Sequence, residues 1–230
     1  HTLDLASLDR DWRERSIAEM RRVIDCALGL RGWFANAASP IGIVTNVGGY
    51  SMDAPLRRDA LRARADRLAE SLARLEHPDV ELWPQTMPPY PWHFGGQRFH
   101  NLFLDARWID DHCRATGQRV CLDVSHSALA CAEAHRPLEE FLDVVLPHTA
   151  HLHLADARGV DGEGLQIGEG DLDFGAVAGR VRALAPDASW IPEIWQGHER
   201  DGAGFWTALA RLERSGFGEE ASVPQASSRR

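Results

Sequence analysis

Residues 119–155 read RVCLDVSHSALACAEAHRPLEEFLDVVLPHTAHLHLA, and this stretch decides the fold class. It begins and ends with apolar runs of strand length, Arg119–Val124 and Ala150–Ala155. Between them, over 138–145, apolar residues recur at the three- and four-residue spacing of a helix. Short strands separated by helices are the signature of βαβ units, so the stretch predicts an α/β protein with a parallel sheet.

The same alternation continues on both sides of this unit. Three more runs of strand length lie at Gly42–Val47, Val80–Trp83 and Trp190–Ile194, which makes five strands. Five more helical patterns bring the number of expected helices to six. These patterns lie at Ile17–Leu28, Leu61–Leu75, Leu102–Cys113, Phe174–Leu184 and Phe205–Leu212.

The positions of polar residues favour a barrel over an open doubly wound sheet. They collect at the carboxyl ends of successive strands, where TIM barrels place their chemistry, and Gly48-Gly49 is too weak a signal for a phosphate loop. A (β/α)8 barrel needs eight strands, so we expect an N-terminally truncated one, with roughly 65–75 residues preceding His1. The sheet should then be open, with the strands from Gly42 and Trp190 as its edges.

The domain is expected to cover residues 1–217, followed by a disordered tail over 218–230 that is rich in Ser, Glu and Arg. Unpaired sheet edges favour association, so a homo-oligomer is compatible with this organisation. The net charge of −9 opposes nucleic-acid binding, and all 25 basic residues are arginines, which excludes a Schiff-base lysine. No apolar run reaches the roughly 18 residues of a membrane span, and the four scattered cysteines suit reduced thiols. We therefore expect a cytoplasmic protein without nucleic-acid or membrane partners.

Candidate ligands for a metal ion lie at the strand ends. Asp123 ends one strand, and His126 follows three residues later, a pattern that suits either a metal and its substrate or a helix cap with a surface histidine. His151 and His153 share one face of the next strand, and His153, nearer the carboxyl end, is the candidate ligand, while the other suits a hydrogen-bonded core position. Glu193 lies in an otherwise apolar strand, where an acid is costly to bury unless it is paired or metal-bound.

Two further residues border the same strand ends. Gln85 ends the strand from Val80 and precedes a segment rich in proline and aromatic residues, which suits a cover over a substrate as well as a plain surface loop. Trp195 fits either the wall of a sugar pocket or ordinary packing. Oxygen and nitrogen ligands at consecutive strand ends suit a divalent cofactor, Mn²⁺, Mg²⁺, Co²⁺ or Zn²⁺.

The motifs CLDVSH, HLHLADARG, IGEGDLDF and PEIW, between residues 121 and 195, resemble the xylose isomerase-like superfamily of TIM barrels, also called the AP endonuclease family 2 fold. HTLDL looks like the end of its third strand, and GIVTNVGG looks like its fourth strand. The resemblance implies one divalent metal held by Glu, Asp, His and Glu. Carried over by motif, Asp123, His153 and Glu193 are ligands, and Gln85 stands at the position of the first glutamate.

The resemblance also implies roles around the metal. His126 matches a histidine that contacts substrate, and it joins Glu193 as a candidate catalytic residue. Arg158 resembles a substrate-binding arginine, and Trp195 completes the substrate-binding set. Gln85 is a departure, because an amide oxygen can bind a hard cation but supplies no charge and cannot act as a base.

These residues predict a metal-dependent isomerase or epimerase of a small sugar or polyol-like substrate. Glu193 would move the proton next to a metal-bound carbonyl, and with one base aldose–ketose exchange fits better than inversion. A dehydratase of the inosose or dehydroshikimate type is the nearest alternative, and a degenerate, non-catalytic barrel is another. An endonuclease IV-like activity is disfavoured, because Gly162-Glu163-Gly164 offers no imidazole for further zinc ions.

Overall fold

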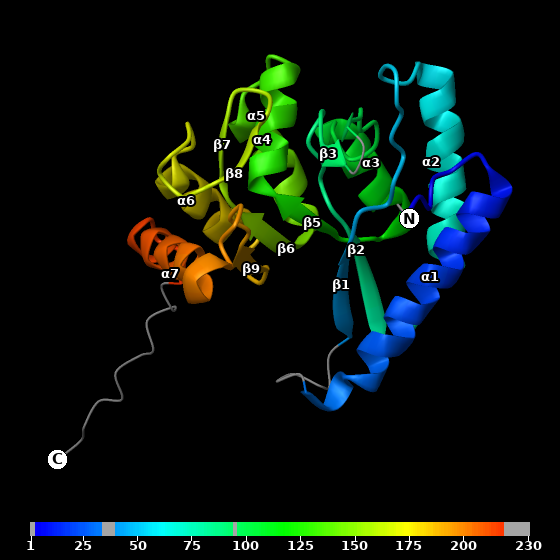
Figure 1. Ribbon diagram of the computed structural model, residues 1–230, viewed down its shortest axis with the longest axis horizontal. Helices are drawn as coiled ribbons and strands as arrows, with labels where there is room; N and C mark the ends of the chain where they lie inside the picture. The colour runs from blue at the N-terminus through cyan, green and yellow to red at the C-terminus, as the bar shows by residue number, and fades with distance from the viewer. Residues whose placement is uncertain (1–2, 34–39, 94–95, 219–230) are drawn as a thin grey trace.

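A parallel sheet of five strands forms the centre of the computed structural model, which describes residues 3–33, 40–93 and 96–218 (Figure 1). Two of its strands, β1 and β2, pair with each other, and β6 lies between β5 and β9. A single parallel bridge between Gln85 and Cys121 joins the two groups. The strands are β1 (Ile41–Thr45), β2 (Val80–Pro84), β5 (Val120–Asp123), β6 (Thr149–Leu154) and β9 (Ser189–Pro192).

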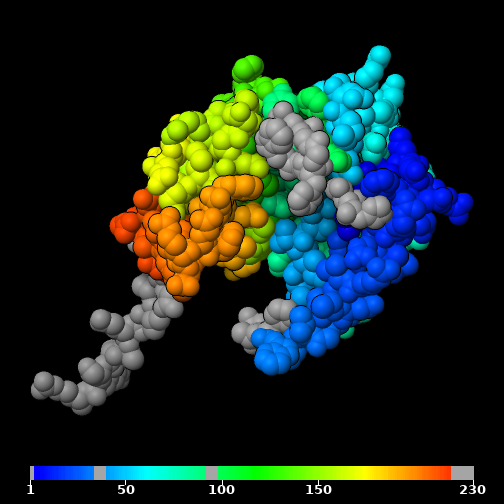
Figure 2. Space-filling model, in the orientation of Figure 1, coloured from blue at the N-terminus to red at the C-terminus, as the bar shows by residue number. Residues whose placement is uncertain are grey.

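The sheet is open, with β1 and β9 at its edges. Figure 2 shows an open notch between the orange segment that follows β9 and the blue segments of the N-terminal half. These are the five strands and the two edges that the sequence predicted, so the expectation of an open, barrel-type α/β sheet is confirmed. Among the described residues, no closed eight-stranded barrel is formed.

Seven α-helices flank the sheet in the described part of the chain, one more than the six expected. The additional helix is α4, which begins at the residue after β5. It shows no amphipathic stripe, because most of its residues are buried on all sides, and this explains why the periodicity missed it. The helices are α1 (Arg10–Gly29), α2 (Arg58–Ala73), α3 (Ala106–Thr116), α4 (Val124–Glu133), α5 (Leu138–Val145), α6 (Phe174–Leu184) and α7 (Glu199–Arg214).

Two short antiparallel hairpins lie near the carboxyl ends of the sheet strands. One joins β3 (Trp92–His93) to β4 (Gly96–Gln97), and the other joins β7 (Asp156–Arg158) to β8 (Gly162–Leu165). Strands of two to four residues are too short to show a period of two, so the sequence did not predict them. Two 3₁₀ turns, η1 (Arg31–Trp33) and η2 (Leu146–His148), complete the described structure.

The two faces of the sheet differ in chemistry. On the outer face, Leu122, Leu152 and Leu154 are fully buried in the hydrophobic core that they share with the helices. On the inner face, the Trp83 ring stacks on His151, whose Nδ1 lies 2.7 Å from the Ser189 hydroxyl. His151 therefore has the ordinary, hydrogen-bonded role that was the alternative for one of the two strand histidines.

The C-terminal tail, the start of α3 and the helix lengths bear on three further expectations. The tail predicted over 218–230 lies outside the described residues except for Gly218. The helix expected from Leu102 begins at Ala106 instead, because the Asp105 carboxylate caps it by accepting a hydrogen bond from the Trp108 amide. None of the described helices combines the length and the apolarity that a bilayer crossing requires.

Candidate metal and substrate site

Three side chains from adjacent strand ends meet at the carboxyl edge of the sheet. Asp123 ends β5, His153 lies near the end of β6, and Glu193 follows β9. One potential ligand atom of each lies within 4.8 Å of the others. The His153 Nδ1 is 2.5 Å from the Glu193 Oε2 and 3.9 Å from the Asp123 Oδ2. The structure thus brings together three of the four residues that the sequence proposed as ligands.

Gln85 lies beside this cluster, as expected from its place after β2. Its side-chain Nε2 donates to the Asp123 Oδ2 at 2.9 Å and lies 3.1 Å from the His153 Nδ1. To coordinate a cation through its oxygen, the Gln85 amide must flip, so that the oxygen, an acceptor, takes the place of the Nε2 donor. Without a cation the nitrogen-inward arrangement is favourable, because a donor faces a carboxylate.

Asp123 caps a helix and also faces the cluster, so the two alternatives left by the sequence are compatible with each other. Its Oδ1 accepts a hydrogen bond of 2.9 Å from the His126 amide and so caps α4, while its Oδ2 faces Gln85 and the cluster. The Thr86 hydroxyl, which accepts from the Asp123 amide at 2.9 Å, ties β5 to the segment after β2. A carboxylate held at both oxygens is positioned before any ligand arrives.

His126 is partly buried, so it is not the exposed surface histidine of the second alternative. Only 19% of its side chain is exposed. Its Nδ1 lies 3.1 Å from both the Thr86 carbonyl and the Asp123 Oδ2. Its Nε2 points toward Glu163, with 3.8 Å to the Oε2. Burial lowers the pKa of His126, which favours the neutral imidazole.

The electrostatics of the cluster suit a cation. Burial raises the pKa of Asp123 well above its usual range, and the nearby Glu193 carboxylate raises it further. Burial is the largest influence on Glu193 and opposes its charge, but the hydrogen bond and the charge of His153, together with Asp123 and His126, leave the Glu193 pKa below its usual value. Two carboxylates and an imidazole that face one point form a donor set that a divalent cation stabilises, so these residues fit the implied metal.

A cavity of about 370 Å³ adjoins the cluster. Asp123, His126 and Glu193 line it on the cluster side, and Trp195, 72% exposed, lies at its border. Glu163 on β8 also lines it, and the sequence reasoning missed this residue. The available signal was an acid between two glycines in the conspicuous loop after β6, which had been considered only for its lack of an imidazole.

Arg158 is placed away from this cavity. Its guanidinium donates to the carbonyl of Glu169 and lies 3.7 Å from the Asp171 carboxylate, and 64% of its side chain is exposed. It is not among the residues that line the cavity. Its contact with substrate stays a prediction, as do the roles of His126 and Trp195.

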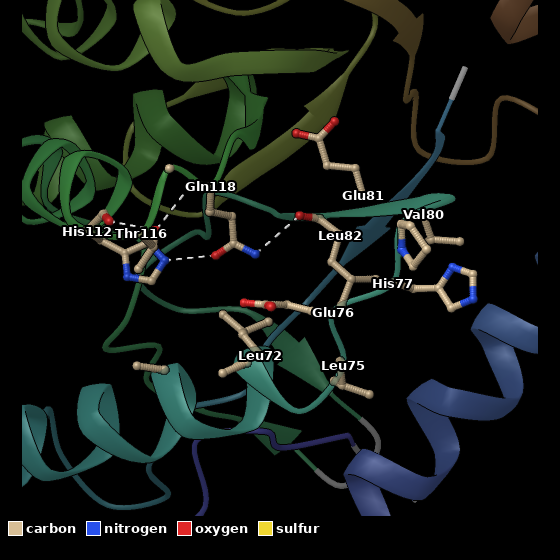
Figure 3. Close-up of a pocket in the computed structure, with 14 residues that line it drawn as sticks. Leu72, Leu75, Glu76, His77, Val80, Glu81, Leu82, His112, Thr116 and Gln118 are labelled. Carbon is tan, nitrogen blue, oxygen red and sulfur yellow. Dashed lines mark hydrogen bonds between the residues drawn. The ribbon is translucent and has the colours of Figure 1, made fainter. Parts of the chain in front are cut away.

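A second and larger cavity, of about 720 Å³, lies between α2 and α3 over the outer face of β2 (Figure 3). Leu72, Leu75 and Leu82 are among its apolar lining residues. The Gln118 amide pairs with the His112 Nε2 at 2.9 Å and donates to the Leu82 carbonyl at 3.3 Å. Within the described residues, the group of potential metal ligands lies at the smaller cavity only.

Comparison with known proteins agrees with this architecture. A family model described as "Xylose isomerase-like TIM barrel" matches residues 1–214, and no curated protein matches the sequence. A D-tagatose 3-epimerase-like protein shares 19% identity, with a TM-score of 0.66 over 92% of this chain and 73% of that one. An L-ribulose 3-epimerase shares 15% identity, with a TM-score of 0.63 over 93% of this chain and 72% of that one. A 3-keto-D-glucoside 4-epimerase from E. coli shares 18% identity, with a TM-score of 0.63 over 92% of this chain and 75% of that one. Identities this low establish a shared fold alone.

Proposed function

We propose that this chain, which belongs to the xylose isomerase-like TIM barrel family, is a metal-dependent isomerase or epimerase of a small sugar or polyol-like substrate. The observation that carries the proposal is the cluster of Asp123, His153 and Glu193 beside a cavity of about 370 Å³. That volume falls in the range of small-molecule sites. The names of the similar structures, epimerases of tagatose and ribulose, support the substrate class.

The metal would be held by Asp123, His153 and Glu193, with Gln85 next to them. Their oxygen and nitrogen donors suit Mn²⁺, Mg²⁺, Co²⁺ or Zn²⁺. When bound, such a cation supplies Lewis-acid polarisation of a substrate carbonyl. Asp123 is suited to binding only, because 3% of its side chain is exposed and both of its oxygens have partners.

Glu193 is suited to chemistry on the substrate. Its side chain is 52% exposed and lines the cavity, so a bound sugar can reach its carboxylate. Contacts with His153 and the other neighbouring groups lower the Glu193 pKa despite its burial, which favours the ionised form that a base requires. Glu193 removes a proton from the carbon next to the carbonyl and returns it to that carbon or its neighbour. His126 contacts the Thr86 carbonyl through its Nδ1, so its Nε2 is the atom that binds a substrate hydroxyl.

The proposal is tested by carbon–hydrogen exchange. The protein with Mn²⁺ is incubated in D₂O with D-tagatose, D-fructose and D-allulose, then with inososes and keto acids, and followed by NMR. We expect deuterium at the carbon next to the carbonyl together with an isomeric sugar. Loss of water from an inosose would instead indicate a dehydratase. Tight Mn²⁺ binding with no exchange on any compound would overturn the proposal in favour of a non-catalytic barrel.

A further inference from the structure

Glu163 is a third carboxylate of the cavity that lies outside the metal cluster. Three acids line this cavity, and Asp123 and Glu193 are both members of the cluster. The Glu163 side chain is 28% exposed, and its Oε2 lies 3.8 Å from the His126 Nε2. This distance is too long for a hydrogen bond. The two groups therefore face the cavity together without being committed to each other.

The backbone around Glu163 is anchored on both sides. Before it, Gly162 pairs with Arg158 across the β7–β8 hairpin. After it, the Gly164 amide donates to the Ser125 hydroxyl at 3.0 Å, and the Gly164 carbonyl accepts from the Trp195 amide at 2.8 Å. Gly164 has a φ of +68°, a conformation that favours glycine. These contacts attach the hairpin to α4 and to the segment after β9, so the β8 backbone that carries Glu163 is fixed at the cavity.

The proposed isomerisation has a proton transfer that the cluster residues do not cover. Glu193 moves a proton between carbon atoms, but the two substrate oxygens must also exchange a proton. Gln85 cannot do this, because an amide is neither an acid nor a base in this range. The charged and titratable groups that face Glu163 are His126 on α4 and Glu193 after β9, and burial raises the Glu163 pKa, which brings it nearer to that of a proton donor.

We propose that Glu163 is the second acid–base residue of the reaction and moves the proton between the substrate oxygens, an inference that rests on the function proposed above. As Glu193 takes the carbon-bound proton, protonated Glu163 gives its proton to the carbonyl oxygen, and an enediol results. Ionised Glu163 then takes the proton of the other hydroxyl while Glu193 returns its proton to the former carbonyl carbon. Both residues are regenerated, and the carbonyl has moved by one carbon.

The test separates carbon exchange from net conversion in Glu163→Gln, with Mn²⁺ and the ketose on which the wild type acts. If Glu163 moves the proton between the substrate oxygens, its loss should slow conversion of the ketose to its isomer more than deuterium exchange at carbon. We expect the ratio of deuterium exchange to product formation to rise by about tenfold or more, with conversion falling on the order of 10²-fold. Glu163→Asp should restore part of the conversion. Mn²⁺ affinity, measured by calorimetry, should be unchanged, because Glu163 is not a ligand.

Glu199→Gln is the matched control, since Glu199 is an exposed acid at the start of α7. It should leave both rates and the melting temperature as in the wild type. An unchanged ratio in Glu163→Gln, or an equal loss of exchange and conversion, would overturn the role of Glu163, and weakened Mn²⁺ binding would make it a ligand instead. Absence of exchange in the wild type would instead contradict the proposed function itself, so the two failures are distinguishable.

Discussion

The cavity beside the cluster and the cavity between α2 and α3 lie at different places on the same sheet and differ in chemistry. The larger one, about 720 Å³, faces the outer side of β2 between two helices, and Val80 and Leu82 extend into it (Figure 3). The smaller one, about 370 Å³, lies at the carboxyl ends of β5 and β9. Parallel strands bring their carboxyl ends to one edge, so side chains from distant parts of the sequence converge there. Convergence of strand ends, and not volume, distinguishes the candidate site.

The polar groups of the two cavities also differ in how they are satisfied. In the outer cavity, Gln118 bridges His112 and the Leu82 carbonyl, and burial lowers the His112 pKa, so this network is neutral and complete. In the inner cavity, Asp123 and Glu193 carry carboxylates whose charges oppose each other. A neutral, paired network stabilises the fold, whereas an acid pair is stabilised by a cation. Variants of the two cavities should therefore affect different properties.

The largest effect is expected from Glu193→Gln at the inner cavity. Removal of a general base lowers turnover by about 10²–10⁴-fold, while the fold is retained because the amide has the same shape. Deuterium exchange into a ketose measures the loss, and circular dichroism with thermal melting checks the fold. Exchange close to the wild-type rate would place the base elsewhere. His126 would then be the first candidate, because it lines the same cavity.

A smaller effect, on a different property, is expected from Leu82→Ala at the outer cavity. Leu82 is 8% exposed and already borders a void, so its truncation should lower the free energy of unfolding by about 2 kcal/mol, at the low end for a core leucine. Urea unfolding measures this change. Turnover per folded molecule and Mn²⁺ affinity should stay as in the wild type. A loss of Mn²⁺ affinity would show that the two cavities are coupled through β2.

Gln85→Glu tests how the charge of the inner cavity affects its affinity for a cation. A third carboxylate next to Asp123 and His153 adds charge to the donor set, so Mn²⁺ affinity should rise on the order of tenfold. The metal-free variant should be less stable than the wild type, since the added charge repels Asp123 and the hydrogen bond from the Gln85 amide is lost. Calorimetric titration and melting with and without EDTA measure both changes. Unchanged affinity would place residue 85 outside the coordination shell.

The smallest effect is expected from Glu76→Gln, which removes an acid that borders the outer cavity. Glu76 is exposed, so its neutralisation should change the free energy of unfolding by no more than about 0.5 kcal/mol. Turnover and Mn²⁺ affinity should be unaffected. This variant is the matched partner of Glu193→Gln, because both replace one carboxylate by an amide. A clear loss of turnover would show that the outer cavity takes part in the reaction.

The limits of the sequence reasoning are visible at particular elements. The apolar periodicity did not reveal helix α4, because most of its residues are buried, and the β7–β8 hairpin was missed because its strands are too short for a detectable period. Glu163 lies on that hairpin, so its place in the site could not be anticipated without it. Arg158, the residue chosen from the same loop, points instead to the Glu169 carbonyl.

The sequence by itself determined the order of the five strands and the four candidate ligands. Both depend on local patterns: apolar periodicity marks the strands, and the last residues of parallel strands must meet at one edge. The tertiary structure alone decided which way the Gln85 amide faces, how His126 is buried, and that Glu163 rather than Arg158 borders the cavity. These outcomes depend on contacts between residues about forty or more positions apart, such as Thr86 with His126, and local patterns carry no information about them.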